Sequence, residues 1–160
     1  MSLKHEFRIS ENVYDEKESS IENTISISDD LVRYMSDSLC WIKTFWNGKK
    51  EKEGLNYYGY TIIKGENVKK LRKVIEAWIH LFKNSTSTII LTGDFIIDEN
   101  KYERIEVSKE VCLAQLIALK KLCVEAEKGR KAVLNEGHHI KYWNIKISPI
   151  FNYSVYTLGQ

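Results

Sequence analysis

The sequence predicts an α+β fold, with a mainly antiparallel sheet and two or three helices packed on one face of it. Two long segments, residues 66–83 and 108–128, carry apolar residues at helical spacing. Several short segments rich in β-branched and aromatic residues surround them, and some follow each other closely enough to pair as hairpins. The strict alternation of strand and helix that builds a parallel nucleotide-binding sheet is missing.

The composition is that of one globular domain. The chain has 160 residues, 43% hydrophobic and 29% charged, and a chain of this length buries roughly two-thirds of its unfolded surface. We therefore expect a single domain over residues 1–160. No apolar run approaches the roughly 20 residues that span a bilayer, and the first ten residues lack the apolar core of a signal peptide. We expect a cytoplasmic protein that does not enter a membrane.

The first quarter is predicted to hold two short strands and the start of a helix. Residues 5–9 and 24–28 alternate as strands do, and the acidic stretch 10–23 between them reads as an exposed loop. Ser28 can cap the helix, and Asp29 and Asp30 suit its first turn. Two endings fit the pattern: the helix continues to about Phe45, or it breaks near Asp37 and residues 39–45 form a strand.

The middle of the chain is predicted to contain strands, a helix and a hairpin. Asn47-Gly48 predicts a turn, because both residues tolerate a positive φ, and the charge run over 46–53 reads as solvated. We expect a strand over 54–64 and a helix over 66–83. Residues 88–97 are the most strongly apolar, and Gly93-Asp94 in their middle indicates a bulge or a bend. Residues 102–107 are expected to return beside them.

The longest helix is expected over residues 108–128, with Ser108 as its cap and Gly129 ending it in a left-handed conformation. Spacings of four, three, four and three align one apolar band, which Leu113, Ile117 and Val124 widen: Cys112, Leu116, Leu119, Cys123 and Ala126. The pattern leaves residues 132–137 unassigned. The C-terminal segment 138–160 is left unassigned as a whole, but residues 140–155 within it are aromatic and β-rich, and Pro149 favours an edge hairpin over a central strand there.

The three cysteines, Cys40, Cys112 and Cys123, are expected to be reduced core thiols. Cys112 and Cys123 lie on one helix, roughly 16 Å apart at 1.5 Å per residue. A disulfide needs Cα atoms within about 7 Å, so these two do not bridge each other. No cysteine or histidine pair has the spacing of a metal site, and we expect no bound metal.

The chain offers few candidates for catalysis. Its glycines match neither GxGxxG nor GxxxxGK[ST], so no nucleotide cofactor is expected. His138 and His139, with Lys141 nearby, could cleave RNA by acid–base chemistry, but neighbours in an extended segment point opposite ways. Three carboxylates could hold a hard cation, although no calcium-loop spacing is present: Asp94, Asp98 and Glu99. His80 is read as structural, and we expect no enzyme and no cofactor.

Charge is unevenly distributed along the chain. Residues 1–40 hold nine acids and four bases, a net charge of −5, whereas the remainder has a net charge of +7. Eight of these nine acids form either a solvated face or a docking surface for a basic partner: Glu11, Asp15, Glu16, Glu18, Glu22, Asp29, Asp30 and Asp37.

Aromatic residues alternate with lysines between Trp41 and Tyr60. The stretch holds Trp41, Trp46, Tyr57, Tyr58 and Tyr60 together with Lys43, Lys49, Lys50 and Lys52. Three interpretations fit it: a hairpin whose rings alternate between core and surface, a protein-binding surface, or a platform on which single-stranded RNA stacks.

Four strings of residues suggest a family. They are Ser28–Tyr34 (SDDLVRY) leading into Trp41-Ile42, then Gly54–Gly59 (GLNYYG), Trp78–Phe82, and Leu91-Thr92-Gly93. In their texture and order, residues 29–129 resemble immunity proteins of bacterial polymorphic-toxin systems, including contact-dependent growth inhibition. The resemblance implies a small cytosolic protein that binds one cognate protein toxin and blocks it without catalysis.

A basic partner would suit the acidic first quarter, because toxins that cut RNA must hold phosphates. The partner-binding residues predicted on this basis combine acids and aromatic rings: Glu16, Glu18, Asp29, Asp30, Asp37, Trp46, Tyr57 and Tyr58. Nucleic acid is not the expected partner. The alternatives are a small RNA-acting enzyme that uses His138 or His139, and an RNA-binding module that uses residues 46–60.

Overall fold

The structure is a computed structural model, and it describes residues 3–10, 23–48 and 50–137. It confirms the predicted α+β fold: a six-stranded antiparallel sheet, a separate hairpin and two long helices. In chain order the elements are β1 (Lys4–Ser10), β2 (Ile25–Ser28), α1 (Asp29–Tyr34), α2 (Ser36–Leu39), β3 (Lys43–Trp46), β4 (Lys50–Glu53), β5 (Tyr60–Ile63), α3 (Glu66–Lys83), β6 (Thr88–Ile96), the 3-10 turn η3 (Ile97–Glu99), β7 (Lys101–Ser108), α4 (Lys109–Gly129) and β8 (Ala132–Glu136).

The six-stranded sheet has the order β2-β1-β8-β5-β3-β4, and each neighbouring pair is antiparallel. β8, which the sequence left unassigned, lies in the middle, where Phe7 pairs with Asn135 and Ile62 with Leu134. At one edge, β4 consists of four exposed charged residues. Charged side chains on an edge strand oppose pairing with other chains.

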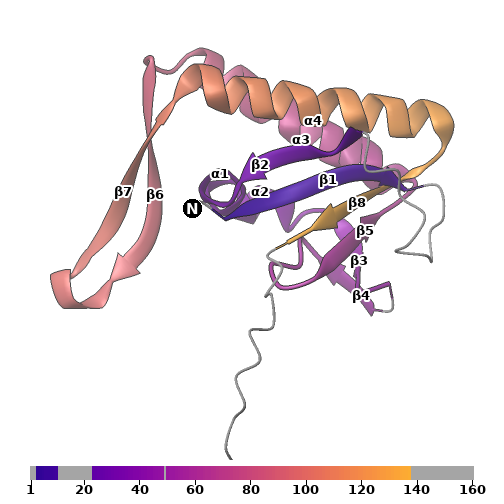
Figure 1. Cartoon of the computed structure of the whole chain (residues 1–160), viewed down its shortest axis with the longest axis horizontal. Coiled ribbons are helices and arrows are strands. Elements are labelled where there is room, and N and C mark those ends of the chain that lie inside the picture. Colours follow the sequence, from indigo (N-terminus) through magenta and orange to yellow (C-terminus); the bar gives the residue numbers. More distant parts are fainter. Residues whose placement is uncertain (1–2, 11–22, 49, 138–160) are drawn as a thin grey trace, which may run out of the picture.

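Helices α3 and α4 pack against each other and cover one face of the sheet (Figure 1). Their predicted apolar stripes are buried, including Leu71 and Ile75 on α3 and Leu116 and Leu119 on α4. At the margin of the α4 band, Ile117 is exposed and Leu122 is buried in its place. Burial of these side chains against the sheet is the main stabilising contribution to the fold.

The hairpin β6–β7 projects away from the sheet beyond the start of α4 (Figure 1). Its base packs on α1 and α4, and Ile89 and Leu91 are buried there. A register shift between Thr92 and Phe95 confirms the predicted bulge at Gly93-Asp94. Beyond this bulge the side chains are largely exposed. We call the hairpin, residues 88–108, the arm.

The helix that begins at Asp29 does not continue to Phe45. It ends at Tyr34, Met35 adopts φ −92° and ψ 0°, and the one-turn helix α2 follows before β3 starts at Lys43. The expectation of a break followed by a strand is confirmed in outline, with the break two residues earlier. The strand is shorter than the predicted 39–45, because it covers Lys43–Trp46 and Leu39 still belongs to α2. Leu39 and Ile42 are buried in the core, so tertiary packing outweighs the helical spacing of this segment.

Two segments differ from expectation around the confirmed turn at Asn47-Gly48, where both residues have positive φ. The charge run is solvated as expected, since all four side chains of Lys50–Glu53 are exposed, but its backbone pairs with β3 as strand β4, which was not expected. The strand expected over 54–64 is limited to Tyr60–Ile63. Gly54 has a φ of 74°, which turns the chain out of β4 and leaves residues 55–59 as a loop.

The helix ends also differ in detail. Ser28 and Ser108 occupy the predicted cap positions, but neither side chain makes a capping hydrogen bond. The left-handed residue after α4 is Arg130, with φ 53°, and Gly129 is still helical. Cys112 and Cys123 are buried as expected, whereas Cys40 is exposed, so the expectation of three core thiols is wrong for Cys40.

Candidate functional site

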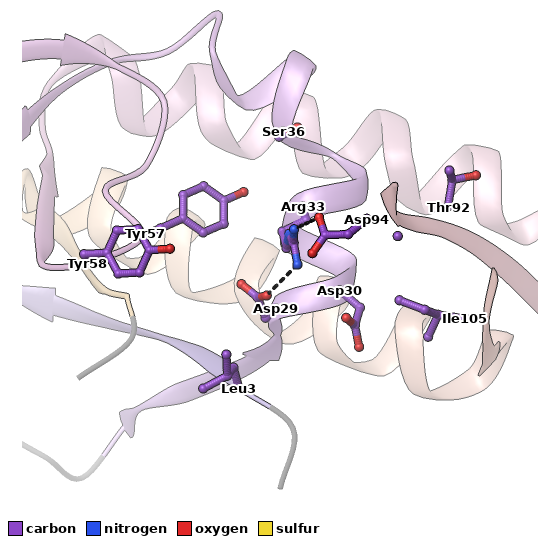
Figure 2. A pocket seen from close by; sticks show the side chains of 11 residues that line it. Leu3, Asp29, Asp30, Arg33, Ser36, Tyr57, Tyr58, Thr92, Asp94 and Ile105 are labelled. Carbon is purple, nitrogen blue, oxygen red and sulfur yellow. Dashed lines mark hydrogen bonds and ion pairs between the residues drawn. The ribbon is translucent and has the colours of Figure 1, made fainter. Parts of the chain in front are cut away.

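A cleft of about 850 Å³ lies where the arm meets the body of the protein. Three parts of the chain form it: α1 with the adjoining Ser36, the loop that carries Tyr57 and Tyr58, and the bulged part of the arm (Figure 2). Leu3 and Ile105 add apolar surface. The remaining lining residues are Asp29, Asp30, Arg33, Thr92, Gly93 and Asp94. A cleft with polar groups from several elements and some apolar wall is the usual form of a binding site.

Helix α1 supplies the charged floor of the cleft. Asp29 and Asp30 form its first turn, and Arg33 follows in the last turn. Leu31 and Val32, between them, are buried in the core. This short helix therefore buries its apolar residues in the core and places three charged residues in the cleft, facing the bulged part of the arm.

Asp29 is held by a buried polar network. The Nε2 atom of His5 lies 3.2 Å from Oδ1 of Asp29, and its Nδ1 atom lies 3.4 Å from Oδ1 of Asn135. His5 and Asn135 are fully buried, on β1 and the central strand β8. Buried polar groups are costly unless they are hydrogen-bonded, so these contacts fix the Asp29 carboxylate in one position at the cleft wall.

Arg33 bridges α1 and the arm. Its Nη2 atom donates a hydrogen bond to Oδ1 of Asp94, and its Nη1 atom lies 3.7 Å from Oδ2 of Asp29 (Figure 2). Burial works against the charge of Arg33, but the hydrogen bond to Asp94 and the charges of Asp94 and Asp29 outweigh it and raise the pKa of the guanidinium group. Arg33 therefore stays charged and links the two carboxylates.

The loop that carries the tyrosines is fixed by asparagine side chains. Oδ1 of Asn56 accepts a hydrogen bond from the amide of Tyr58 at 3.1 Å. Oδ1 of Asn47 accepts from the amide of Tyr60 at 3.2 Å and from Nδ2 of Asn56 at 3.3 Å. A Cβ atom at Gly59 would lie 2.5 Å from Asn47 Oδ1 and 2.7 Å from Asn56 Nδ2, so any other residue here would displace the two amide groups that make these hydrogen bonds. The loop thus presents both tyrosines to the cleft.

The two tyrosines have different surroundings. Tyr57 is half-buried and its ring meets the ring of His5 edge to face, with centroids 5.0 Å apart. Burial, together with the nearby charge of Asp29, raises the pKa of Tyr57 to about 12. Its phenol is therefore neutral at physiological pH. Tyr58 is 74% exposed and offers its ring to solvent.

Four of the eight predicted partner-binding residues line this cleft: Asp29, Asp30, Tyr57 and Tyr58. Asp37 is exposed on α2 and is not part of the lining. Trp46 lies on β3 and also stands outside it, where its Nε1 atom donates to the carbonyl of Gly54. Glu16 and Glu18 lie outside the described residues.

The other candidates from the sequence do not gather at the cleft. Asp94 lines it, whereas Asp98 and Glu99 are in the turn at the far end of the arm. Within residues 3–10, 23–48 and 50–137, no group of three histidines, cysteines or carboxylates is arranged to hold a metal ion. His80 is exposed on α3, so it is not a core histidine. His138, His139 and Lys141, together with the expected edge hairpin, lie outside the described residues.

Sequence reasoning missed His5 and Arg33. A histidine two residues from Phe7 in an alternating strand points to the same face as that buried ring, which was a signal for a buried histidine. Arg33 lies four residues after Asp29 on one helix, a spacing typical of ion pairs. No local signal connects either residue with Asp94 or Asn135, because these contacts depend on the tertiary fold.

The arrangement is suited to binding a cation. Three carboxylates and two aromatic rings face one cavity, and carboxylates and ring faces both attract positive charge. His5 lies behind the carboxylate of Asp29 and is fully buried, so it does not contact a molecule in the cleft. It positions Asp29.

Comparison of the chain with models of known protein families, with curated proteins and with solved structures finds no match. In the part of the chain that the structure describes, the helices are too short or too polar to cross a membrane.

Proposed function

We propose that this chain is an immunity protein, which binds one cognate protein toxin and keeps it from acting. The observation that carries the proposal is the cleft, where Asp29, Asp30 and Asp94 face the same space as Tyr57 and Tyr58. Acidic groups speed the approach of a basic partner and exclude acidic ones. Tyrosines bury much area with few rotatable bonds, and they are enriched at the centres of protein interfaces.

The arm extends this surface with the same sign of charge. Residues 88–108 hold five acids and two bases, a net charge of −3. Both bases are engaged within the arm: Lys101 pairs with Glu99, and Arg104 donates to Oγ1 of Thr92 at 3.0 Å. A basic toxin, such as a nuclease that holds phosphates, fits a surface of this kind.

The proposal predicts that a toxin domain is encoded beside this chain, and it is tested by mixing the chain with a catalytically inactive form of that domain. We expect the two to elute together from a size-exclusion column, and we expect the chain to abolish the activity of the intact toxin. Two separate peaks at micromolar concentration would contradict the proposal, because neutralisation requires a lasting complex.

A charge reversal tests whether the cleft takes part. Asp30 lines the cleft without a part in the His5 network, so Asp30→Lys should leave the fold intact and lower the association rate constant roughly tenfold at low salt. The matched control is Glu53→Lys, an exposed acid on the edge strand β4 away from the cleft lining. Both association rate constants are measured on a biosensor at low and high salt. If Asp30→Lys and Glu53→Lys lower the rate constant equally, the toxin does not dock at the cleft.

A further inference from the structure

The carboxylate of Asp29 is already held in a fixed position in the free protein, with its Oδ2 atom placed to contact a cation in the cleft. The Asp29 side chain is only 7% exposed, and its Oδ1 atom is fixed by His5, 3.2 Å away. Its other oxygen, Oδ2, is the one nearest Arg33. Because His5 holds Asp29 from behind and is itself held by Asn135, the carboxylate keeps its place whether or not Arg33 is present.

Arg33 contacts one exposed carboxylate, that of Asp94, and one that is largely buried, that of Asp29. The side chain of Arg33 is 41% exposed and that of Asp94 is 65% exposed. Ion pairs that are open to water are weak, since each partner can exchange its contact for solvent or for another ion. The contact of Arg33 with Asp94 can therefore be exchanged at little cost. Its contact with Asp29, at 3.7 Å, costs more to give up because that carboxylate is largely buried, so an incoming guanidinium group has to take this contact over.

The walls of the cavity fit a second guanidinium group better than an ammonium group. Figure 2 shows Arg33 between the loop of Tyr57 and Tyr58 on one side and Asp94 of the arm on the other. A guanidinium group is planar, forks onto carboxylate oxygens and stacks on aromatic rings, whereas a lysine ammonium is a compact and strongly hydrated charge.

We infer that this cleft is a binding site for an arginine side chain of the partner protein, and that Arg33 occupies the site until the partner's arginine displaces it. The inference rests on the proposed function for the identity of the partner. The site itself can be tested without the partner. In the free protein Arg33 lowers the apparent affinity for an added arginine, because only the fraction of molecules with Arg33 displaced can bind it.

The probe is N-acetyl-arginine methylamide, titrated into the full chain and followed by NMR shifts of the amides of Asp94, Tyr58 and Asp30. We expect Arg33→Ala to bind this probe at least about tenfold more tightly than the wild type does. The lysine analogue should bind Arg33→Ala more weakly than the arginine probe, and the double variant Arg33→Ala/Asp94→Asn should lose the gain.

Arg72 offers a matched control. It also contacts two carboxylates, Glu127 at 2.6 Å and Glu76 at 3.0 Å, but it lies on α3 outside the cleft lining. Arg72→Ala should gain no arginine binding. The inference is overturned if Arg33→Ala binds the arginine probe no better than the wild type does. It is also overturned if Arg72→Ala gains as much, or if the lysine analogue binds equally well.

These outcomes are separate from those of the proposed function. Arginine binding by Arg33→Ala without a complex with the toxin domain would support the site and remove the immunity function. A complex with the toxin domain, without arginine binding by Arg33→Ala, would support the immunity function and remove the arginine site.

Discussion

Helix α4 and the arm follow each other in the chain, and both are rich in apolar residues, but those residues have different surroundings. On α4, Leu116 and Leu119 are buried in the core. At the far end of the arm, Ile97 is 83% exposed and the rings of Phe95 and Tyr102 contact each other, with centroids 5.1 Å apart, while both remain largely exposed. Apolar side chains of α4 stabilise the fold, and those at the arm's far end are left outside it.

The difference separates apolar side chains that stabilise the fold from apolar side chains that the fold leaves exposed. A two-stranded hairpin is marginally stable by itself, so the arm depends on its buried base, Ile89 and Leu91. Exposed apolar residues that gather on a projecting element are typical of interaction surfaces. The cleft lies where these two regions meet, between α1 and the bulged part of the arm.

The largest loss of stability is expected from Leu116→Ala. The side chain is fully buried between α4 and the rest of the core, and its truncation leaves a cavity. The free energy of unfolding should fall by about 3 kcal/mol or more, as measured by urea denaturation. A loss below about 1 kcal/mol would mean that α4 is packed less tightly than the structure indicates.

The next largest effect is expected from His5→Ala. It leaves the buried Asp29 carboxylate without its contact at 3.2 Å, which should lower the free energy of unfolding by about 2–3 kcal/mol. His80→Ala is the matched control, since His80 is exposed on α3 and should change stability by less than about 0.5 kcal/mol. If His5→Ala and His80→Ala unfold at similar urea concentrations, His5 does not stabilise the fold through Asp29.

A smaller effect is expected from the pH dependence of Tyr57. The pKa of this phenol is about 12 in the folded protein, above the ordinary value of 10.0, because of burial and then the charge of Asp29. The folded state therefore binds the phenolic proton more tightly than the unfolded state does. The resulting stability is complete below about pH 10 and is lost as pH rises toward about 12.

Urea midpoints measured between pH 9 and pH 11.5 check this prediction. The wild type should lose stability faster with rising pH than Tyr57→Phe, which lacks the titrating group. Tyr102→Phe, at an exposed position on the arm, should follow the wild type. Parallel curves for the wild type and Tyr57→Phe would show that the phenol titrates equally in both states.

The smallest effect on stability is expected from Ile97→Ala. The side chain is almost entirely exposed, so the change in the free energy of unfolding should stay within about 0.5 kcal/mol. The difference between the effects of Leu116→Ala and Ile97→Ala on the free energy of unfolding measures how unequally α4 and the far end of the arm contribute to stability. A loss above about 1 kcal/mol would indicate that Ile97 packs against the body in solution.

Much of the fold could be predicted because helical periodicity records burial directly. Local sequence was enough to predict the apolar stripes of α3 and α4 and the hairpin with its bulge. β8 was not, because its residues AVLNE are buried toward both faces of the sheet and lack the alternation of a half-buried strand. The break at Met35 comes two residues before the predicted one, and Leu39 and Ile42, which follow it, are buried in the core despite their helical spacing to the residues of α1.

The cleft could be predicted only in part. Asp29, Asp30, Tyr57 and Tyr58 were selected for their chemistry, and the fold brings them together. Their role as partner-binding residues stays a prediction. The same chemistry selected Asp37 and Trp46, which the fold places outside the cleft lining. Residues that share a site across loops and strands are joined by sheet pairing, which composition and spacing do not reveal.

The position of β8 has a consequence for how the chain folds during synthesis. This strand separates β1 from β5 and begins only at residue 132. Until the ribosome has released it, the sheet exists as two halves with no hydrogen bonds between them, and Asn135 is not there to meet His5. Contacts this distant along the chain slow folding. The cleft therefore takes its final form late, after both long helices have emerged.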